Sequence, residues 1–427
     1  MSLKQRLVVL NFFQYYIWGA WLLTIGTWWF QTLHWSGTSF GAIFSTMGIA
    51  SLFMPSLAGI VADKWINAER LYGAFQIAGA AVLVAIPHAA DPQQMFWVVL
   101  LYMCFYMPTI SLSITVAYNA LKQEGLDVVS TYPPIRVWGT LGFIAATWTT
   151  SLLGFKASPA QFHVAAAASL LLGLYAFSLP KCPPRLDASH SRSLTDRLGL
   201  TSFVLFRNRN MAVFFVFAML LGAALQLTNA YGDAFLSDFV KVPAYANLLT
   251  VKYSTIIISI SQFSETAFIL TIPFFLKRFG IKAVMTMSML AWVLRFGLFA
   301  FGNPDPLGGL WMIVLSCIVY GMAFDFFNIS GSLFVEGQAD PKIRASAQGL
   351  FMLMTNGIGA VLGSFISGWM IDRFFTDAAG IKDWHGIWTT FALYALAMAV
   401  AFVPLFKHRH EPHKVVPVHG AADVGNP

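Results

Sequence analysis

Long apolar stretches alternate with short polar intervals along almost the whole chain. Twelve of these stretches are close to the length of about 20 residues that a helix needs to cross a bilayer. In the first half they lie near Val8–Trp29, Phe40–Val61, Leu71–Ile86, Met95–Ala117, Pro134–Leu153 and Phe162–Leu179. In the second half they lie near Met211–Phe235, Tyr253–Phe275, Val284–Phe301, Leu310–Phe334, Ala345–Met370 and Trp388–Phe406. The pattern predicts an all-α membrane protein with twelve transmembrane helices in two groups of six.

Composition agrees with this prediction. Hydrophobic residues make up 57% of the 427 residues, charged residues only 11%, and the mean hydropathy is +0.67. Soluble domains carry about 25% charged residues, so an ordinary soluble protein is excluded.

The longest polar interval divides the chain near its middle. We expect an N-terminal six-helix half over 1–180, a cytosolic linker over 181–210, a C-terminal six-helix half over 211–407 and a cytosolic tail over 408–427. Pro133-Pro134-Ile135-Arg136 is echoed by Pro341-Lys342-Ile343-Arg344 at the equivalent position of the second half. Parallel repeats of this kind are typical of transporters whose halves rock around a central site.

The basic residues predict the orientation in the membrane. With both chain ends on one side, nineteen Lys and Arg residues fall in the loops and ends of that side and five in those of the other. Cytosolic loops collect basic residues, so both termini are expected inside. The net charge of +7 is then explained by anionic lipid at the membrane surface, without any nucleic-acid partner.

Several motifs of soluble enzymes are absent or misplaced, so we do not expect an enzyme. Gly37-Thr38-Ser39-Phe40-Gly41 has the letters of a hydrolase nucleophile elbow but begins a predicted membrane helix instead of following a strand. No glycine-rich phosphate loop with its Lys occurs, which argues against ATP-driven pumping. The Cys and His residues lack metal-site spacing, and no cofactor is expected.

Two polar residues interrupt the stretch Tyr253–Phe275. Gln262 and Glu265 are three positions apart and therefore share one helix face. A charged side chain at the centre of a membrane helix costs roughly 2.5–3.5 kcal/mol, so such residues usually have a function. Burial also disfavours the ionised carboxyl group, which makes Glu265 a candidate proton carrier.

Similar polar and aromatic stripes occur on three other predicted helices, at spacings of three or four residues. The four stripes are Arg136, Thr140 and Phe143; Gln226 and Asn229; Gln262 and Glu265; and Tyr320, Phe324 and Asn328. We interpret them as walls of one cavity. The competing explanations are interhelical hydrogen bonding for the amides, simple packing for the aromatics, and a snorkelling anchor for Arg136. Arg295 is expected to snorkel or to pair structurally and is left out of the site.

Several strings resemble one family along nearly the whole chain. They are Phe53-Met54-Pro55, Ala62-Asp63-Lys64-Trp65, Pro133 to Thr140, Leu225 to Asn229, Asp325 to Ser332 and Arg344 to Gly349. In this order they resemble the bacterial nucleoside:proton symporters of the major facilitator superfamily. Asp63 and Lys64 also resemble the superfamily's loop motif, in which an acid and a base brace cytosolic helix ends, although Trp65 and the residues after it depart from that motif.

The resemblance implies a proton-coupled importer of nucleosides in the bacterial inner membrane. The sequence does not reveal the oligomeric state, but a self-contained bundle of two halves needs no partner, so we expect a functional monomer. Nucleoside binding is implied for nine positions: Arg136, Thr140, Phe143, Gln226, Asn229, Gln262, Glu265, Tyr320 and Phe324. Proton coupling falls to Glu265 with Arg136 as its partner, and Asp325 is a second candidate. Glu265 could bind substrate, the proton or both. A carrier of sugars or another neutral solute, and a receptor or enzyme with an intramembrane pocket, remain alternatives.

Overall fold

The computed structural model describes residues 1–184, 200–340 and 343–408, and within them the regular structure is helical apart from one antiparallel bridge between Thr376 and Lys382. The all-α prediction is therefore confirmed for these residues. Most of the expected linker, the Lys342 part of the internal echo and the tail from residue 409 lie outside the described residues.

The first half of the chain forms a bundle whose helices follow the predicted apolar stretches. They are α1 (Leu3–Gly19), α2 (Ile25–Trp28), α3 (Gly37–Lys64), α4 (Ala68–Ala85), α5 (Pro92–Gln123), α6 (Val128–Leu152) and α7 (Ala160–Ala176). The first stretch was predicted as one helix, but α1 ends at Gly19 and turns separate it from α2.

The second half forms another bundle. Its helices are α9 (Arg209–Asp238), α10 (Leu249–Lys252), α11 (Ser254–Ile258), α12 (Ile260–Phe301), α13 (Leu310–Gln338), α14 (Arg344–Met352), α15 (Ala360–Phe374) and α16 (Trp384–Leu405). The long α12 contains two predicted stretches, and Gly280 bends it between them with a φ of 78°. Because this backbone region favours glycine, the bend sits at a residue suited to it.

Eight helices of the described residues, counted with short helical extensions, are long and apolar enough to cross a membrane. The predicted twelve are not all recognisable by this measure. α12 counts once although its kink at Gly280 separates two predicted stretches, the first stretch is broken after Gly19, and α7 has only 17 residues. Helix α6 is also not among the eight. The coarser statement, an all-helical integral membrane protein, holds.

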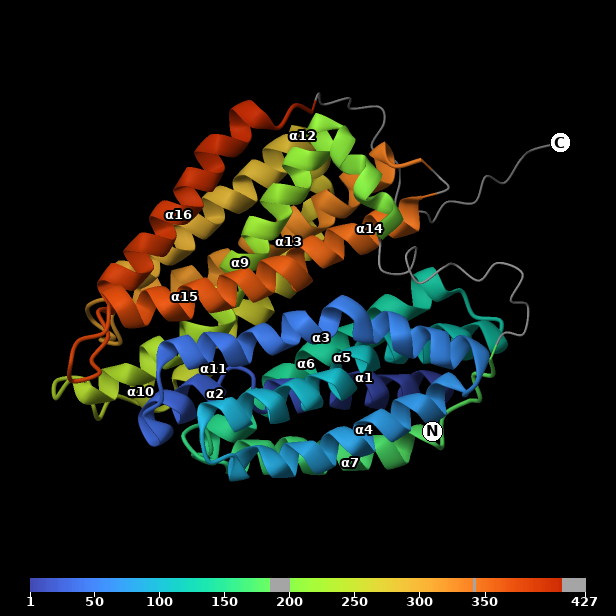
Figure 1. Cartoon of the computed structure of the whole chain (residues 1–427), viewed down its shortest axis with the longest axis horizontal. Coiled ribbons are helices and arrows are strands. Elements are labelled where there is room, and N and C mark those ends of the chain that lie inside the picture. Colours follow the sequence, from blue (N-terminus) through green and yellow to red (C-terminus); the bar gives the residue numbers. More distant parts are fainter. Residues whose placement is uncertain (185–199, 341–342, 409–427) are drawn as a thin grey trace.

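The two bundles lie one above the other in Figure 1, with the first half below. They meet at the left, near α2, α10 and α11, and separate toward the right, where α14 and the N-terminus lie. We call the side where the halves separate, toward which α3 runs to its end, the linker end. The opposite side is the far end.

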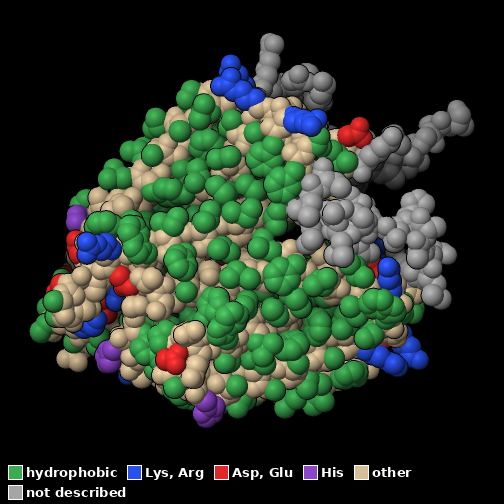
Figure 2. Space-filling model, in the orientation of Figure 1, with side chains coloured by type: hydrophobic (Ala, Val, Ile, Leu, Met, Phe, Trp, Pro, Cys, Tyr) green, Lys and Arg blue, Asp and Glu red, His purple; other side chains and the backbone are tan. Residues whose placement is uncertain are grey.

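The surface agrees with a membrane location. Figure 2 shows hydrophobic side chains over the middle of this face, whereas most charged side chains gather toward its margins. Many large apolar side chains of the helices are exposed, including Leu270 at 79% and Val400 at 65%. Exposed apolar surface on this scale indicates contact with lipid, since a soluble protein would bury it.

Candidate functional site

The stripe on α6 faces helix α1. The guanidinium carbon of Arg136 lies 4.0 Å from the centre of the Tyr15 ring, which is a cation–π contact. Gly139 and Gly142 of α6 and Gly19 of α1 allow this approach; a Cβ at Gly19 would come within 2.5 Å of the backbone of α6. Sequence reasoning missed Tyr15, because nothing in the pattern of α1 distinguishes it from neighbouring aromatic residues.

Arg136, Thr140 and Phe143 all keep partial exposure within their helix. Arg136 therefore does not behave as a pure lipid-surface anchor, because its charged end is held against a ring on a neighbouring helix. The prediction that these three residues share one face of α6 stays compatible with the structure.

The amides of the second half have unused hydrogen-bonding capacity. The Oε1 atoms of Gln226 and Gln262 are both buried, and neither has a hydrogen-bond partner among the described residues. Buried polar groups normally find partners, and leaving one unsatisfied costs about 1–3 kcal/mol. These two oxygen atoms are therefore free to accept a hydrogen bond from a ligand. The competing explanation, that the amides hydrogen-bond between helices, does not account for them.

Three of the helices that carry candidate residues converge on Arg295 of α12. Its Nε donates to the Thr228 hydroxyl at 3.2 Å, and its Nη1 to the Ser261 hydroxyl at 3.4 Å. Thr228 precedes Asn229, and Ser261 precedes Gln262. Its guanidinium carbon also lies 4.6 Å from the centre of the Tyr320 ring on α13. The predicted stripes on α9, α12 and α13 thus meet at one level of the second half.

The predicted snorkelling of Arg295 is wrong. The side chain has 0% exposure, and Nη1 also donates to the Ser316 carbonyl at 2.8 Å. The alternative, a structural role between helices, fits these contacts. Its partners are hydroxyls, a carbonyl and rings on other helices, which the polarity of its own helix could not reveal.

The aromatic stripe on α13 is ordered as a stack. The rings of Tyr320 and Phe324 are nearly parallel, with centres 6.1 Å apart and 9° between their planes. Tyr320 is only 5% exposed and Trp292 packs edge-on against it, whereas Phe324 is partly exposed. Phe324 is therefore the more accessible ring of the stack.

Glu265 connects the two halves electrostatically. Its carboxyl group interacts with the charge of Arg136 across the interface and lies within electrostatic range of Tyr15. On its own side it interacts in the same way with Tyr320 and Asp325. Among the salt bridges of the described residues there is none between Arg136 and Glu265, so their interaction acts at longer range than a direct ion pair.

Asp325 is 4% exposed, and its Oδ2 atom lacks a hydrogen-bond partner among the described residues. Asp325 was predicted to point away from the aromatic stripe. In the structure it is close enough to Glu265 for the two carboxyl groups to interact electrostatically. Two carboxyl groups in one low-dielectric region cannot both ionise cheaply. They are therefore coupled candidates for one proton.

A second polar group joins the halves at the far end, and sequence reasoning missed it. Its centre is Asp233 of α9, which is 1% exposed and lies one helical turn beyond Asn229. Asp233 accepts hydrogen bonds from Thr27 of the first half at 2.6 Å, from Ser254 at 2.6 Å and from Thr255 at 2.9 Å.

Lys156, in the connection between α6 and α7, completes this far-end cluster. Its Nζ donates to Ser254 at 2.8 Å, to Ser237 at 3.1 Å and to the Val251 carbonyl at 3.0 Å. Burial lowers the pKa of the Lys156 ammonium group, and the Asp233 carboxylate opposes that shift. We define the far-end cluster as Thr27, Lys156, Asp233, Ser237, Ser254 and Thr255.

Further contacts join the halves at the same end. The Asp372 carboxylate accepts hydrogen bonds from the backbone N–H groups of Gly37 and Thr38, at 2.7 and 2.6 Å, and so caps α3 from α15. The Lys382 Nζ lies 3.9 Å from the centre of the Phe30 ring. The N–H groups at the start of α3 are thus satisfied by the opposite half.

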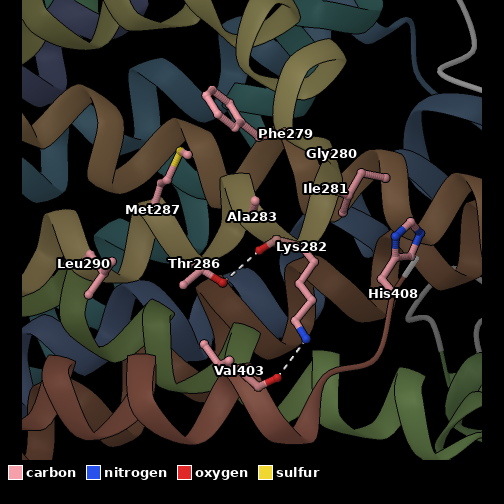
Figure 3. A pocket seen from close by; sticks show the side chains of 10 residues that line it. All are labelled: Phe279, Gly280, Ile281, Lys282, Ala283, Thr286, Met287, Leu290, Val403 and His408. Atoms are coloured by element: carbon pink, nitrogen blue, oxygen red, sulfur yellow. Dashed lines mark hydrogen bonds between the residues drawn. The ribbon is translucent and has the colours of Figure 1, made fainter. Parts of the chain in front are cut away.

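A separate cavity of about 460 Å³ lies at the linker end of the second half, beside the bend of α12 (Figure 3). Its lining is mainly apolar, with Lys282 donating to the Val403 carbonyl at 2.8 Å. None of the predicted site residues lines it. Asp63 and Lys64 lie in the last turn of α3, at the linker end. Among the described residues, no group of His, Cys, Asp and Glu could hold a metal ion.

Comparison with known proteins identifies relatives along nearly the full length. The family profile described as "Nucleoside H+ symporter" matches residues 1–411. The chain is 53% identical to the xanthosine permease of Escherichia coli strain K12, over 97% of this chain and 98% of the permease. It is 49% identical to the nucleoside permease NupG of the same strain, over 96% of this chain and 97% of NupG.

Solved structures give the same result. The crystal structure of the nucleoside transporter NupG superposes with a TM-score of 0.90 and covers 96% of this chain and 100% of its own. A peptide transporter of the POT family superposes with a TM-score of 0.70 at 14% identity, covering 94% of each chain. At that identity the second similarity concerns the fold alone.

Proposed function

The chain belongs to the nucleoside H+ symporter family, and from this premise we propose that nucleoside and proton pass between its two halves, through a cavity walled by α6, α9, α12 and α13. By family membership the protein is a proton-coupled nucleoside transporter and not an enzyme. The proposal concerns which residues do this work.

The observation that carries the proposal is the pair of unpartnered amides. A nucleoside is uncharged and offers amide-like base edges and ribose hydroxyls, so neutral acceptors such as Gln226 and Gln262 suit it. Phe324 supplies an aromatic face for the base, with Tyr320 behind it. Asn229 lies beside Thr228 at the same level, and Arg136, Thr140 and Phe143 form the opposing wall.

We assign the proton to Glu265, coupled to Asp325. When Glu265 is protonated, Arg136 is left with its Tyr15 contact; when it is ionised, the attraction of Arg136 across the interface increases. Proton release would therefore draw the two halves together at this level. Glu265 is also near Tyr320, so a bound nucleoside would feel the same change of charge.

The structure is proposed to represent a state closed at the far end, which we assign to the outside of the cell. The hydrogen bonds that join the halves in the described part of the chain are all near that end, from Trp148 and Lys156 to Thr38. The excess of Lys and Arg in the loops of the linker end supports assigning that end to the cytosol. On this basis we propose alternating access by a monomer of the twelve-helix major facilitator type.

Uptake into membrane vesicles tests the function. We expect labelled uridine and adenosine to accumulate when the outside is more acidic than the inside, and to equilibrate only when the gradient is collapsed. Excess xanthosine added as a competitor then measures how the cavity ranks purine bases. A tenfold excess of glucose should leave uptake unchanged.

Two results would contradict the proposal. Glucose competition without nucleoside uptake would favour a sugar carrier. Normal nucleoside affinity after the double substitution of Gln226 and Gln262 by Leu would show that the substrate binds elsewhere. Ser169→Ala, at a buried hydroxyl between α4 and α7, is the matched control for loss of a buried polar group.

A further inference from the structure

We propose that Arg295 is a positioning residue for nucleoside binding, which holds Tyr320 and the segments of α9 and α12 around Thr228 and Ser261 in the geometry that the substrate needs. The inference rests on the proposed function. It adds a residue that supports the cavity-lining side chains without lining the cavity itself. Arg295 touches no part of the space between the halves, since it is fully buried within the second half.

Each contact of Arg295 reaches an element that carries a candidate site residue. On α9 it binds Thr228, the neighbour of Asn229, and on α12 it binds Ser261, the neighbour of Gln262. On α13 it binds the Ser316 carbonyl, and the Ser316 hydroxyl donates back to the Arg295 carbonyl at 2.9 Å. Ser316 lies one helical turn before Tyr320.

The Tyr320 ring is held from three directions. Arg295 lies over it at 4.6 Å, the Trp292 ring meets it edge-on with centres 6.0 Å apart, and Phe324 stacks against it in parallel. Removal of the Arg295 side chain would leave the Tyr320 ring without a neighbour on that side, so that the ring could tilt toward the vacated space. Phe324, which shares the stack, would move with it.

A guanidinium group is required by this geometry. Its planar fork donates in several directions at once while its face lies against a ring, and an ammonium group does not combine these two functions. A buried charge is also costly: no described carboxylate forms an ion pair with Arg295, and its Nη2 atom has no partner among the described residues. The protein keeps this buried charge despite its cost in free energy, which indicates that the contacts made by the guanidinium group serve the function of the protein.

The test is a double-mutant cycle in nucleoside uptake. Arg295→Met should raise KM about fivefold or more, in the range of a desolvated cation–π contact, and Arg295→Lys should raise it less. In a Tyr320→Phe background, which keeps the ring, Arg295→Met should still raise KM. In a Tyr320→Leu background, which removes the ring, it should add little.

Protein amount, melting temperature and Vmax are measured alongside KM. A purely structural Arg295 would lower these quantities with an unchanged KM and would be equally damaging in every background; that pattern overturns the inference. Ser169→Ala is again the control for a buried polar loss far from the cavity.

The cycle also separates this inference from the proposed function. If Tyr320→Leu alone leaves KM unchanged, the proposed cavity is wrong at Tyr320. If Tyr320→Leu raises KM while Arg295→Met does not, the cavity stands and the positioning role of Arg295 is refuted. Binding of labelled nucleoside to purified protein gives the same comparison without the transport step.

Discussion

Glu265→Gln is expected to abolish proton-driven accumulation of nucleoside while nucleoside exchange continues. The amide is nearly the same size as the carboxyl group but does not take up and release a proton at physiological pH. For one proton per nucleoside, each unit of pH gradient can support about tenfold accumulation. In the variant, the steady-state ratio of inside to outside nucleoside should fall to about one, since no coupling would remain.

Measurement of exchange across the same vesicles distinguishes the roles left open for Glu265. An unchanged KM for exchange assigns the residue to the proton alone, whereas a raised KM adds a contact with substrate. Glu69→Gln is the matched control, because Glu69 is a buried glutamate bound to Asn67 and the Cys182 N–H at the linker end. Full uphill transport by the Glu265→Gln variant would refute the assignment, and Asp325→Asn would then be the variant to examine.

The fold was largely predictable because the membrane imposes a simple rule on the sequence. Backbone groups in hydrocarbon must be satisfied internally, so a long apolar stretch is a helix. The departures are local. The end of α1 at Gly19 depends on packing and leaves no mark in the hydrophobic pattern. At Gly280 the pattern does predict a boundary between two stretches, but not that a single backbone angle makes it a sharp kink.

The site was predictable only where polarity and periodicity coincide. Gln262 and Glu265 are conspicuous because they interrupt an apolar stretch, and the Gln262 Oε1 atom has no hydrogen-bond partner among the described residues. Their part in a binding site stays a prediction. The contacts of Tyr15 and Arg295 could not be predicted in this way, and the cause is the same for both residues. Their roles depend on a ring or a hydroxyl on another helix, and periodicity within one helix carries no information about partners.

The far-end cluster was hidden for a related reason. Asp233 continues the Gln226 and Asn229 stripe at helical spacing, but its partners Thr27 and Lys156 lie in the other half of the chain. The nearest hydroxyls mediate between the carboxylate and the ammonium group, so no short-range charge pattern marks the pair. It follows that this cluster can form only when the halves meet at the far end.

Asp233→Asn is therefore expected to shift the protein toward the state that is open at the far end. The substitution leaves the Lys156 ammonium group in a buried position without its counter-charge, and breaking a buried pair is costly. Lys156 retains some exposure, so we discount the cost to about 1.4 kcal/mol, which changes the ratio of closed to open protein about tenfold. If the closed state was previously favoured by less than about tenfold, the open state should become the majority in the variant.

Spin labels at Leu153 and Leu307, two exposed residues in far-end connections of opposite halves, would report this shift as a longer mean distance. The labels are introduced after replacement of Cys104, Cys182 and Cys317. Asp238→Asn is the matched control, because this acid lies on the same helix but binds Lys241 and Trp384 of its own half. Lys156→Met combined with Asp233→Asn should have less than the additive effect, since either change removes the same attraction. An unchanged distance distribution in Asp233→Asn would mean that the remaining contacts, such as the Asp372 cap on α3, hold the far end closed without the cluster.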